Sequence, residues 1–201
     1  YRDNFSPNNI CTIIPPTRIV PLKETQDDNK VLFLLGGNGA GYVFDQDDWH
    51  NLIKNIRTLA DKNKIVPIIV TSRRLNKSEE QFIYDGLYDI CDESSVWFHK
   101  DNTQLNLQEV FQKVICIFVS EESTTMTAEA ISSGLPVATL YPKKFNPDKT
   151  FIEQVHRYEK MKLIKRQNIN NNQLEISLSI DNHSNIMRIR EELKNQVIRK
   201  L

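Results

Sequence analysis

Short apolar runs alternate along most of the chain with stretches in which apolar residues recur at helical spacing. Each run is about as long as a strand, and most runs are apolar at every position: 31–35, 66–70, 95–98, 115–119 and 136–140. Such uninterrupted runs are typical of parallel strands that helices cover on both faces. We therefore expect a parallel sheet with strands at these positions.

The intervals between these runs have the periodicity of helices. Trp49, Leu52 and Ile56 share one helical face, and Asp45 is placed to cap that helix at its start. Strands that alternate with helices form βαβ units, so we predict an α/β fold, a Rossmann-like three-layer domain with a mainly parallel sheet. Further helices are expected at 78–87, 106–114, 123–134 and around 151–158.

The last part of the chain has a different character. Residues 166–185 are polar and rich in Asn, which suggests a loop, a hairpin or a mobile linker with at most one short strand, at 174–180. Apolar residues from Ile186 to Val197 then recur at spacings of three and four, which predicts an amphipathic helix. We expect a domain over 1–165, and a segment over 166–201 whose helix packs on or beyond it.

Composition narrows the classes of protein. The 201 residues carry 26 basic and 26 acidic side chains, and this balance argues against a nucleic-acid or anionic-membrane binder. No apolar run is long enough to span a membrane, and no signal peptide is evident. Three widely spaced cysteines suit a reducing compartment, so we expect a cytoplasmic protein without a disulfide framework or zinc site. The chain begins at Tyr1, without Met, and we expect it to lack an N-terminal domain of the same protein.

Four glycines lie within "GGNGAG", residues 36–41, directly after an apolar run. The spacing fits neither the dinucleotide fingerprint nor the Walker pattern, because Tyr42 and Val43 stand where those motifs need other residues. One interpretation is a tight turn between strand and helix with no ligand. The other is a close approach of the backbone to a ligand, since four glycines exceed what a turn needs.

Two more polar groups come directly after apolar runs. Ser72, Arg73 and Arg74 come after the run at 66–70, where the arginines could bind phosphate or form a solvated surface pair. Ser123, Thr124 and Thr125 open the helix after 115–119, either as an ordinary cap or as a phosphate site. The acids at 121–122 oppose phosphate binding unless they face away or pair with the arginines. In a parallel sheet the glycine loop, the residues at 72–74 and those at 123–125 meet at one edge and would form a diphosphate pocket.

The joint pattern resembles the C-terminal domain of GT-B glycosyltransferases and, more narrowly, the Elm-type mitochondrial fission protein family. The resemblance covers about residues 8–165, and Glu122 departs from it mildly, because the family usually has Asp there. The matching motifs are "GG" at 36–37 with Tyr42, "SRR" at 72–74, Ser123 with Met126 and Glu129–Ala130, and "G-x-PV" at 134–137.

The resemblance implies one half of a GT-B fold that binds a nucleoside-diphosphate sugar, with Glu129 on the ribose and His99 as a candidate contact to the base. No catalytic residue, bound metal or cofactor is expected in this half, and the acids at 45–48 are expected to serve the helix start. Two alternatives stay open: a non-catalytic recruiting module, as the plant members of the family suggest, and a nucleotide or phosphate-ester binder of another class. The expected nucleotide or phosphate contacts are Gly37, Asn38, Gly39, Ser72, Arg73, Arg74, Ser123, Thr124, Thr125 and Glu129.

Overall fold

The computed structural model describes residues 12–22, 29–101, 105–171 and 173–199. The strands are β1 (Lys30–Leu35), β2 (Tyr42–Val43), β3 (Val66–Thr71), β4 (Cys116–Ser120), β5 (Val137–Tyr141), β6 (Lys144–Phe145) and β7 (Lys165–Asn168). The helices are α1 (Gln46–Asn63), α2 (Lys77–Leu87), α3 (Leu107–Phe111), α4 (Thr124–Ser132), α5 (Lys149–Lys160) and α6 (Asn182–Ile198). Strands and helices alternate as the sequence predicts.

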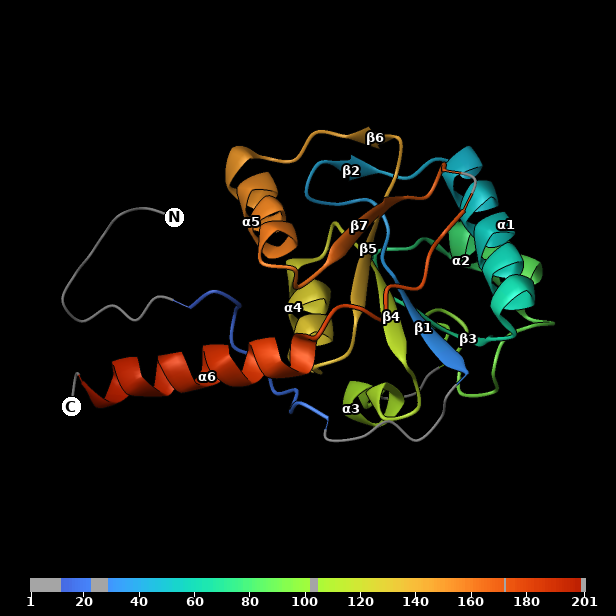
Figure 1. The fold of residues 1–201 in the computed structure, drawn as a ribbon. Coiled ribbons are helices and arrows are strands. Elements are labelled where there is room, and N and C mark those ends of the chain that lie inside the picture. The colour runs from blue at the N-terminus through green and yellow to red at the C-terminus, as the bar shows by residue number, and fades with distance from the viewer. Residues whose placement is uncertain (1–11, 23–28, 102–104, 172, 200–201) are drawn as a thin grey trace.

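Five of the strands form one parallel sheet in the order β3-β1-β4-β5-β7 (Figure 1). Leu34 of β1 pairs with Val70 on one side and with Val119 on the other, so β1 and β4 are central strands. From β1 the chain first builds outward to β3 and then returns to build the other half from β4. The switch point of this doubly wound α/β sheet lies between β1 and β4.

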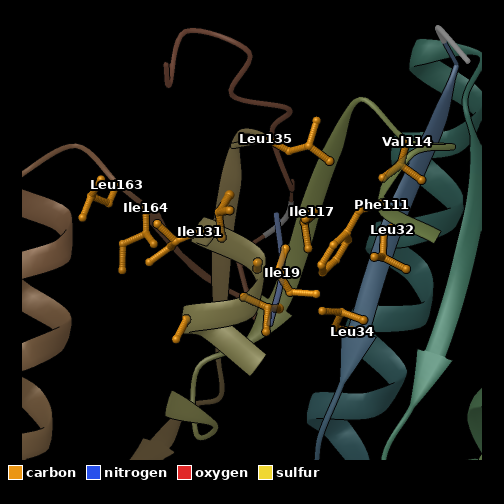
Figure 2. Close-up of a cluster of buried hydrophobic side chains, with 14 of the residues drawn as sticks. Ile19, Leu32, Leu34, Phe111, Val114, Ile117, Ile131, Leu135, Leu163 and Ile164 are labelled. Carbon is orange, nitrogen blue, oxygen red and sulfur yellow. The ribbon is translucent and has the colours of Figure 1, made fainter. Parts of the chain in front are cut away.

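Both faces of the sheet are buried, because successive side chains of a strand point to opposite faces. Leu32 and Leu34 pack with α3, α4 and α5 in one cluster, part of which is drawn in Figure 2. Val31, Phe33 and Leu35 pack with α1 and α2 in a second cluster, where Phe33 stacks on Phe118. The apolar runs at 31–35, 66–70, 115–119 and 136–140 thus correspond to strands covered on both sides.

A small antiparallel ribbon of β2 and β6 lies at the rim of the domain (Figure 1). Tyr42 stacks on Phe145 of the other strand with ring centroids 5.7 Å apart. Gly41 leads into β2 with φ of 84°, in the left-handed region that favours glycine. The ribbon therefore continues the glycine loop outward from the sheet.

The expected strand at 95–98 does not form. Only Val96 makes a bridge, to Val70, and Trp97 then donates its amide to Asp101 instead of continuing the ladder. This segment lies beside the edge strand β3, where Trp97 is buried but Phe98 is 49% exposed. An apolar run that borders solvent gains too little from pairing to extend the sheet.

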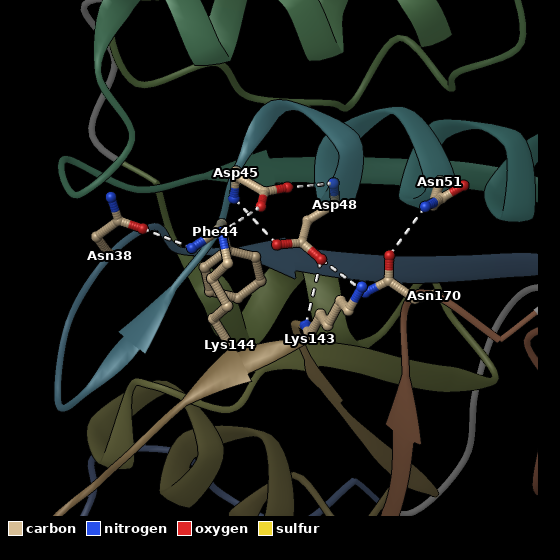
Figure 3. Close-up of polar contacts among 8 residues, drawn as sticks. All are labelled: Asn38, Phe44, Asp45, Asp48, Asn51, Lys143, Lys144 and Asn170. Atoms are coloured by element: carbon tan, nitrogen blue, oxygen red, sulfur yellow. Dashed lines mark hydrogen bonds and ion pairs between the residues drawn. The ribbon is translucent and has the colours of Figure 1, made fainter.

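The Asn-rich segment begins as the fifth strand of the sheet. β7 crosses the boundary expected at residue 165, so the prediction of a loop, hairpin or linker is wrong for 166–168. The segment is then fixed to α1: Asn170 bonds Asp48 at 2.6 Å and Asn51 at 2.9 Å, as Figure 3 shows. Asn55 donates to the carbonyls of Ile169 and Asn171, at 2.8 Å each. Residues 174–180 contain no strand.

The C-terminal amphipathic helix is confirmed as α6. Asp181 caps its start, and the Asn182 amide group donates to the carbonyls of Leu135 and Leu163 at 2.9 Å each. Ile186 is buried against the core, whereas the second half of the helix extends away from the body of the domain (Figure 1). Over the described residues, no helix is both long and apolar enough to cross a membrane.

Candidate functional site

The three polar pieces predicted from the sequence meet at the C-terminal edge of the sheet. The amide of Gly36, just past β1, donates to Ser120 Oγ at the end of β4 at 2.8 Å. The amide of Ser72, just past β3, donates to the carbonyl of Leu35 at 2.9 Å. The glycine loop therefore lies at the switch point, between the "SRR" loop on one side and the start of α4 on the other.

Three of the loop glycines are needed because other parts of the chain approach them. A Cβ atom on Gly36 would lie 1.7 Å from Glu122 Oε1, and one on Gly37 would lie 2.4 Å from the carbonyl oxygen of Arg74. A Cβ atom on Gly41 would lie 2.3 Å from the carbonyl oxygen of Asn146. The packing of the fold is thus sufficient reason for these three glycines, without a ligand.

The tip of the loop is more open. Gly39 exchanges backbone hydrogen bonds with Tyr42 at 3.1 and 2.8 Å, and Asn38 Oδ1 accepts from the amide of Phe44 at 2.7 Å (Figure 3). A Cβ atom on Gly39 would lie 3.1 Å from Nη1 at the end of the flexible Arg74 side chain and 3.5 Å from Glu122 Cγ. Gly39 is therefore the loop glycine least constrained by the rest of the fold.

Glu122 is buried beneath the glycine loop. Its side chain is 0% exposed, and neither carboxylate oxygen has a hydrogen-bond partner. The nearest cation is Arg74, with Nη1 3.6 Å from Oε1 and 3.1 Å from the carbonyl oxygen of Glu122. Burial raises the pKa of Glu122 to about 8, against the opposing effects of the Arg74 charge and the nearby Gly37 amide. The group is therefore mostly a neutral acid at neutral pH.

Glu121 has a different partner from its neighbour. It accepts a bidentate pair of hydrogen bonds from Arg166 of β7, at 2.7 and 2.8 Å, and one each from Tyr42 and Thr139 at 2.7 Å. The guanidinium group also lies over the ring of Tyr141, 4.6 Å from its centroid. The negative charge of Glu121 is thus balanced inside the fold, between the glycine loop and the far half of the sheet.

The two arginines after β3 have unequal roles. Arg74 contacts Glu122, whereas Arg73 is exposed and its side chain makes no hydrogen bond or ion pair within the described part of the chain. The loop itself is fixed by Ser72, whose hydroxyl accepts from the amide of Arg74 at 3.2 Å, and by His99, whose Nε2 lies 2.6 Å from the carbonyl of Leu75. Among the residues that the structure describes, Arg73 is therefore the cation of this loop without a partner.

The start of α4 offers backbone donors to the same edge. Ser123 caps the helix by accepting from the amide of Met126 at 3.3 Å, and Thr124 and Thr125 are the first two helical residues. Glu129 lies further along on α4, half buried, and burial raises its pKa. First-turn amides of a helix lack intrahelical partners and favour an anion.

A groove of about 410 Å³ lies away from this edge, between residues 12–20 and α6 and close to the end of α4. It contains none of the residues that the sequence selects as phosphate contacts. Among the residues that the structure describes, no three His, Cys, Asp or Glu side chains are grouped so that they could hold a metal ion.

The comparisons with known proteins point to one family. The family model described as mitochondrial fission ELM1 matches residues 6–176. The chain belongs to this family. No curated protein matches it. Among solved structures, this ELM1-family chain is similar to a mutant of the Thermobaculum terrenum O-GlcNAc transferase, with 13% identity and a TM-score of 0.44. The match covers 92% of this chain and 34% of the transferase, so the chain spans about a third of that protein. A likeness this distant gives no indication of activity.

The structure thus brings together most of the residues that the sequence selects in this ELM1-family chain. The glycine loop, Ser72 to Arg74 and the start of α4 meet at one edge, while the His99 ring nitrogen faces the loop backbone. The polar residue that sequence reasoning missed is Arg166, because β7 reads "KRQN" and carries no apolar pattern. A signal did exist: an acid placed directly after a buried strand, as Glu121 is, needs a cation as partner.

Proposed function

We propose that this chain is the donor-binding domain of a GT-B-type glycosyltransferase and takes a nucleoside-diphosphate sugar at the switch point of its sheet. The observation that carries this proposal is the meeting of the glycine loop, the "SRR" loop and the start of α4 at one place between β1 and β4. Open α/β sheets bind their ligands at such switch points. One half of a GT-B fold would need a second domain, which we propose as an N-terminal domain of the same protein.

Each polar group has a role in this proposal. Arg73 and the amides at the start of α4, with Thr124 and Thr125, bind the diphosphate. The loop tip of Asn38 and Gly39, together with Gly37, borders the phosphates, and Ser72 positions Arg73. Glu129 accepts hydrogen bonds from the ribose hydroxyls, a role that suits a half-buried carboxylate without another partner in the described part.

The charge balance of the edge supports an anionic ligand in spite of two adjacent acids. Glu121 is paired with Arg166, and Glu122 is mostly neutral at neutral pH because burial raises its pKa to about 8. Arg73 stays exposed and unpaired among the described residues. The two acids that directly precede α4 therefore add little negative charge at the proposed phosphate position, so the objection that the sequence raises against phosphate is weakened.

The decisive experiment is calorimetry of the 201-residue chain with uridine, guanosine and adenosine diphosphates and with the matching nucleosides. We expect at least one diphosphate to bind more tightly than its nucleoside. Arg73→Ala should weaken the diphosphate by about 1.5–3 kcal/mol, the range for a hydrogen bond to a charged group, and leave the nucleoside and the melting temperature unchanged. Arg188→Ala on the exposed face of α6 is the matched control for loss of one positive charge.

Glu129→Gln tests the other end of the ligand. It should weaken both diphosphate and nucleoside, since the ribose is common to them, by about 1–3 kcal/mol. Equal or absent binding of the whole set by the wild-type chain would count against a donor site. Loss of thermal stability in Glu129→Gln without any change in affinity would assign this residue to the fold.

The second candidate is a non-catalytic recruiting module on the same fold. The observation that favours it is that Gly36, Gly37 and Gly41 are all explained by contacts inside the chain. A scaffold predicts that the diphosphates fail to bind while the surface around the loop tip still matters for a protein partner. Diphosphate calorimetry separates the two candidates: Gly39→Ala, whose methyl group would lie 3.1 Å from Arg74 Nη1, should weaken a diphosphate only if the donor site exists.

A further inference from the structure

A carboxyl group of the chain itself lies directly beneath the glycine loop at the switch point. Glu122 Oε1 occupies the space where a side chain on Gly36 would begin, and its Cγ lies 3.5 Å from the corresponding point on Gly39. The side chain is completely buried, and both oxygens lack a hydrogen-bond partner. A buried carboxylate without partners is costly, so the protonation of this group must affect whatever lies next to it.

Arg74 is the cation that covers this group. Its side chain is 43% exposed, and Nη1 reaches both the carbonyl oxygen and the carboxylate of Glu122, at 3.1 and 3.6 Å. The same nitrogen lies over the loop tip, 3.1 Å from the Cβ position of Gly39. Arg74 therefore stands between a buried acid on its inner side and solvent at the proposed phosphate position on its outer side.

The other charged groups near Glu122 are paired with partners other than Glu122. The glycine loop, residues 36–41, contributes no charged side chain. The charge of Glu121 is balanced by Arg166, and the Tyr42 hydroxyl donates a hydrogen bond to it. Burial together with Glu121 raises the pKa of Tyr42, so the phenol stays neutral. Arg74 is thus the group among the described residues whose position responds to the charge of Glu122.

We propose that Glu122 is a proton-linked positioning residue for Arg74: when a diphosphate binds at the loop tip, Arg74 turns from Glu122 to the ligand and Glu122 holds a proton taken from solvent. When ionised, Glu122 retains Arg74 and repels the ligand. When protonated, it releases Arg74 to the phosphate. This inference rests on the proposed donor site, and in it the protonation of Glu122 regulates diphosphate binding.

The charges next to Glu122 determine whether diphosphate affinity rises or falls with pH. In the free chain the Arg74 charge favours ionisation of Glu122 less strongly than burial favours the neutral acid, and the pKa of Glu122 stands at about 8. In the complex the cation has left and an anion has arrived, so the pKa lies higher still. Affinity is then constant below pH about 8 and falls above it, by up to about tenfold per pH unit. Binding takes up as much as one proton per diphosphate in that window.

The experiment measures diphosphate affinity of the wild-type chain between about pH 7 and 9.5 and proton uptake in buffers of different ionisation enthalpy. The diphosphate group does not titrate there, since its last pKa is about 6. Where the base of the ligand loses a proton in this range, as uracil and guanine do, that contribution is subtracted before wild type and variants are compared. Wild type should lose affinity above pH 8 and take up a proton. Glu122→Gln should bind as wild type does at pH about 7 and show neither effect. Glu93 is an exposed acid beyond the start of β3, so Glu93→Gln is the control for loss of one carboxyl group and should behave as wild type.

A ligand-free measurement tests the Arg74–Glu122 coupling on its own. Carbon-detected NMR of the Glu122 carboxyl group should show its pKa rise in Arg74→Met, because the opposing charge is gone. An unchanged titration in Arg74→Met, or affinity that does not vary with pH in a chain that binds diphosphates, would overturn this inference and leave the donor site standing. Failure of every diphosphate to bind would instead overturn the proposed function, and this inference with it.

Discussion

Replacing Arg166 by Met should destabilise the domain strongly, although the residue lies in a segment that looks like a linker in the sequence. Met keeps much of the volume of the arginine stem and removes the guanidinium group. Glu121, whose side chain is 1% exposed, would then lose its bidentate partner. The hydrogen bonds from Tyr42 and Thr139 would remain, at 2.7 Å each. The buried carboxylate would therefore be hydrogen-bonded but without a counter-charge.

The magnitude depends on the burial of the pair. The Arg166 side chain is 12% exposed, so solvent screens little of the interaction. Removing one partner of a buried ion pair costs about 3–5 kcal/mol, and the two remaining donors place the loss near the lower value. At about 2–4 °C for each kcal/mol in a chain of this size, a loss of about 3 kcal/mol lowers the melting temperature by about 6–12 °C. Arg166 stays charged in the wild type, because Glu121 outweighs the effect of burial and raises the pKa of Arg166.

Urea unfolding followed by far-UV circular dichroism gives the free energy directly. Arg57→Met is the matched control, since its ion pair with Asp89 is 42% and 47% exposed and should be worth no more than about 1 kcal/mol. The double variant Arg166→Met with Glu121→Gln should be more stable than Arg166→Met alone, because the stranded charge is gone. A loss below about 1 kcal/mol for Arg166→Met, or no recovery in the double variant, would refute the reasoning.

Three further predictions concern the same edge. Glu122→Gln should stabilise the domain by about 3 kcal/mol at pH 7. The pKa of Glu122 is about 8 in the folded chain and 4.5 in the unfolded chain, so the stability of the wild type is full below pH 4.5 and is lost as the pH rises towards 8. The difference between the melting temperatures of variant and wild type should therefore widen from pH 5 to 8. Gly41→Ala should cost more than about 2 kcal/mol in urea unfolding, because φ is 84° and the methyl group would meet Asn146. Asn55→Ala should lower the free energy of unfolding by about 2 kcal/mol, because the Asn55 side chain binds the carbonyls of Ile169 and Asn171. Hydrogen exchange should become faster at 169–171, while β1 stays protected.

The central strands could be predicted because burial on both faces requires an apolar residue at nearly every position of the strand. β1, β3, β4 and β5 lie where the apolar runs are, and Asp45 caps α1 as its position suggests. The family resemblance is visible for the same reason, since its motifs stand at the ends of these strands. The topology of a parallel sheet brings the residues after each buried strand to one edge, so the meeting of the three polar pieces could be predicted without any distance.

The outer strands could not be predicted, because their environment is decided by tertiary contacts. β7 is polar, with Arg166 and Gln167 facing partners outside the strand. The run at 95–98 is apolar but borders solvent, and the ladder ends after Val96. The glycines misled in a third way. Their number suggested a ligand, which stays a prediction, and the sequence could not show that Gly36 and Gly37 also make room for Glu122 and for the backbone of Arg74.

The two adjacent acids at the end of β4 show how burial can reverse an argument from charge. In the sequence they oppose phosphate equally, because charge counts do not distinguish one carboxylate from another. In the fold, the charge of Glu121 is neutralised by Arg166, and Glu122 is held as a neutral acid by the loss of solvent around it. Among the described residues, Arg73 is a cation at this edge that is exposed and has no partner, and the amides of α4 add the positive end of a helix dipole. The charge that Glu122 contributes at the switch point therefore depends on one buried proton, and raising the pH through about 8 adds a negative charge there.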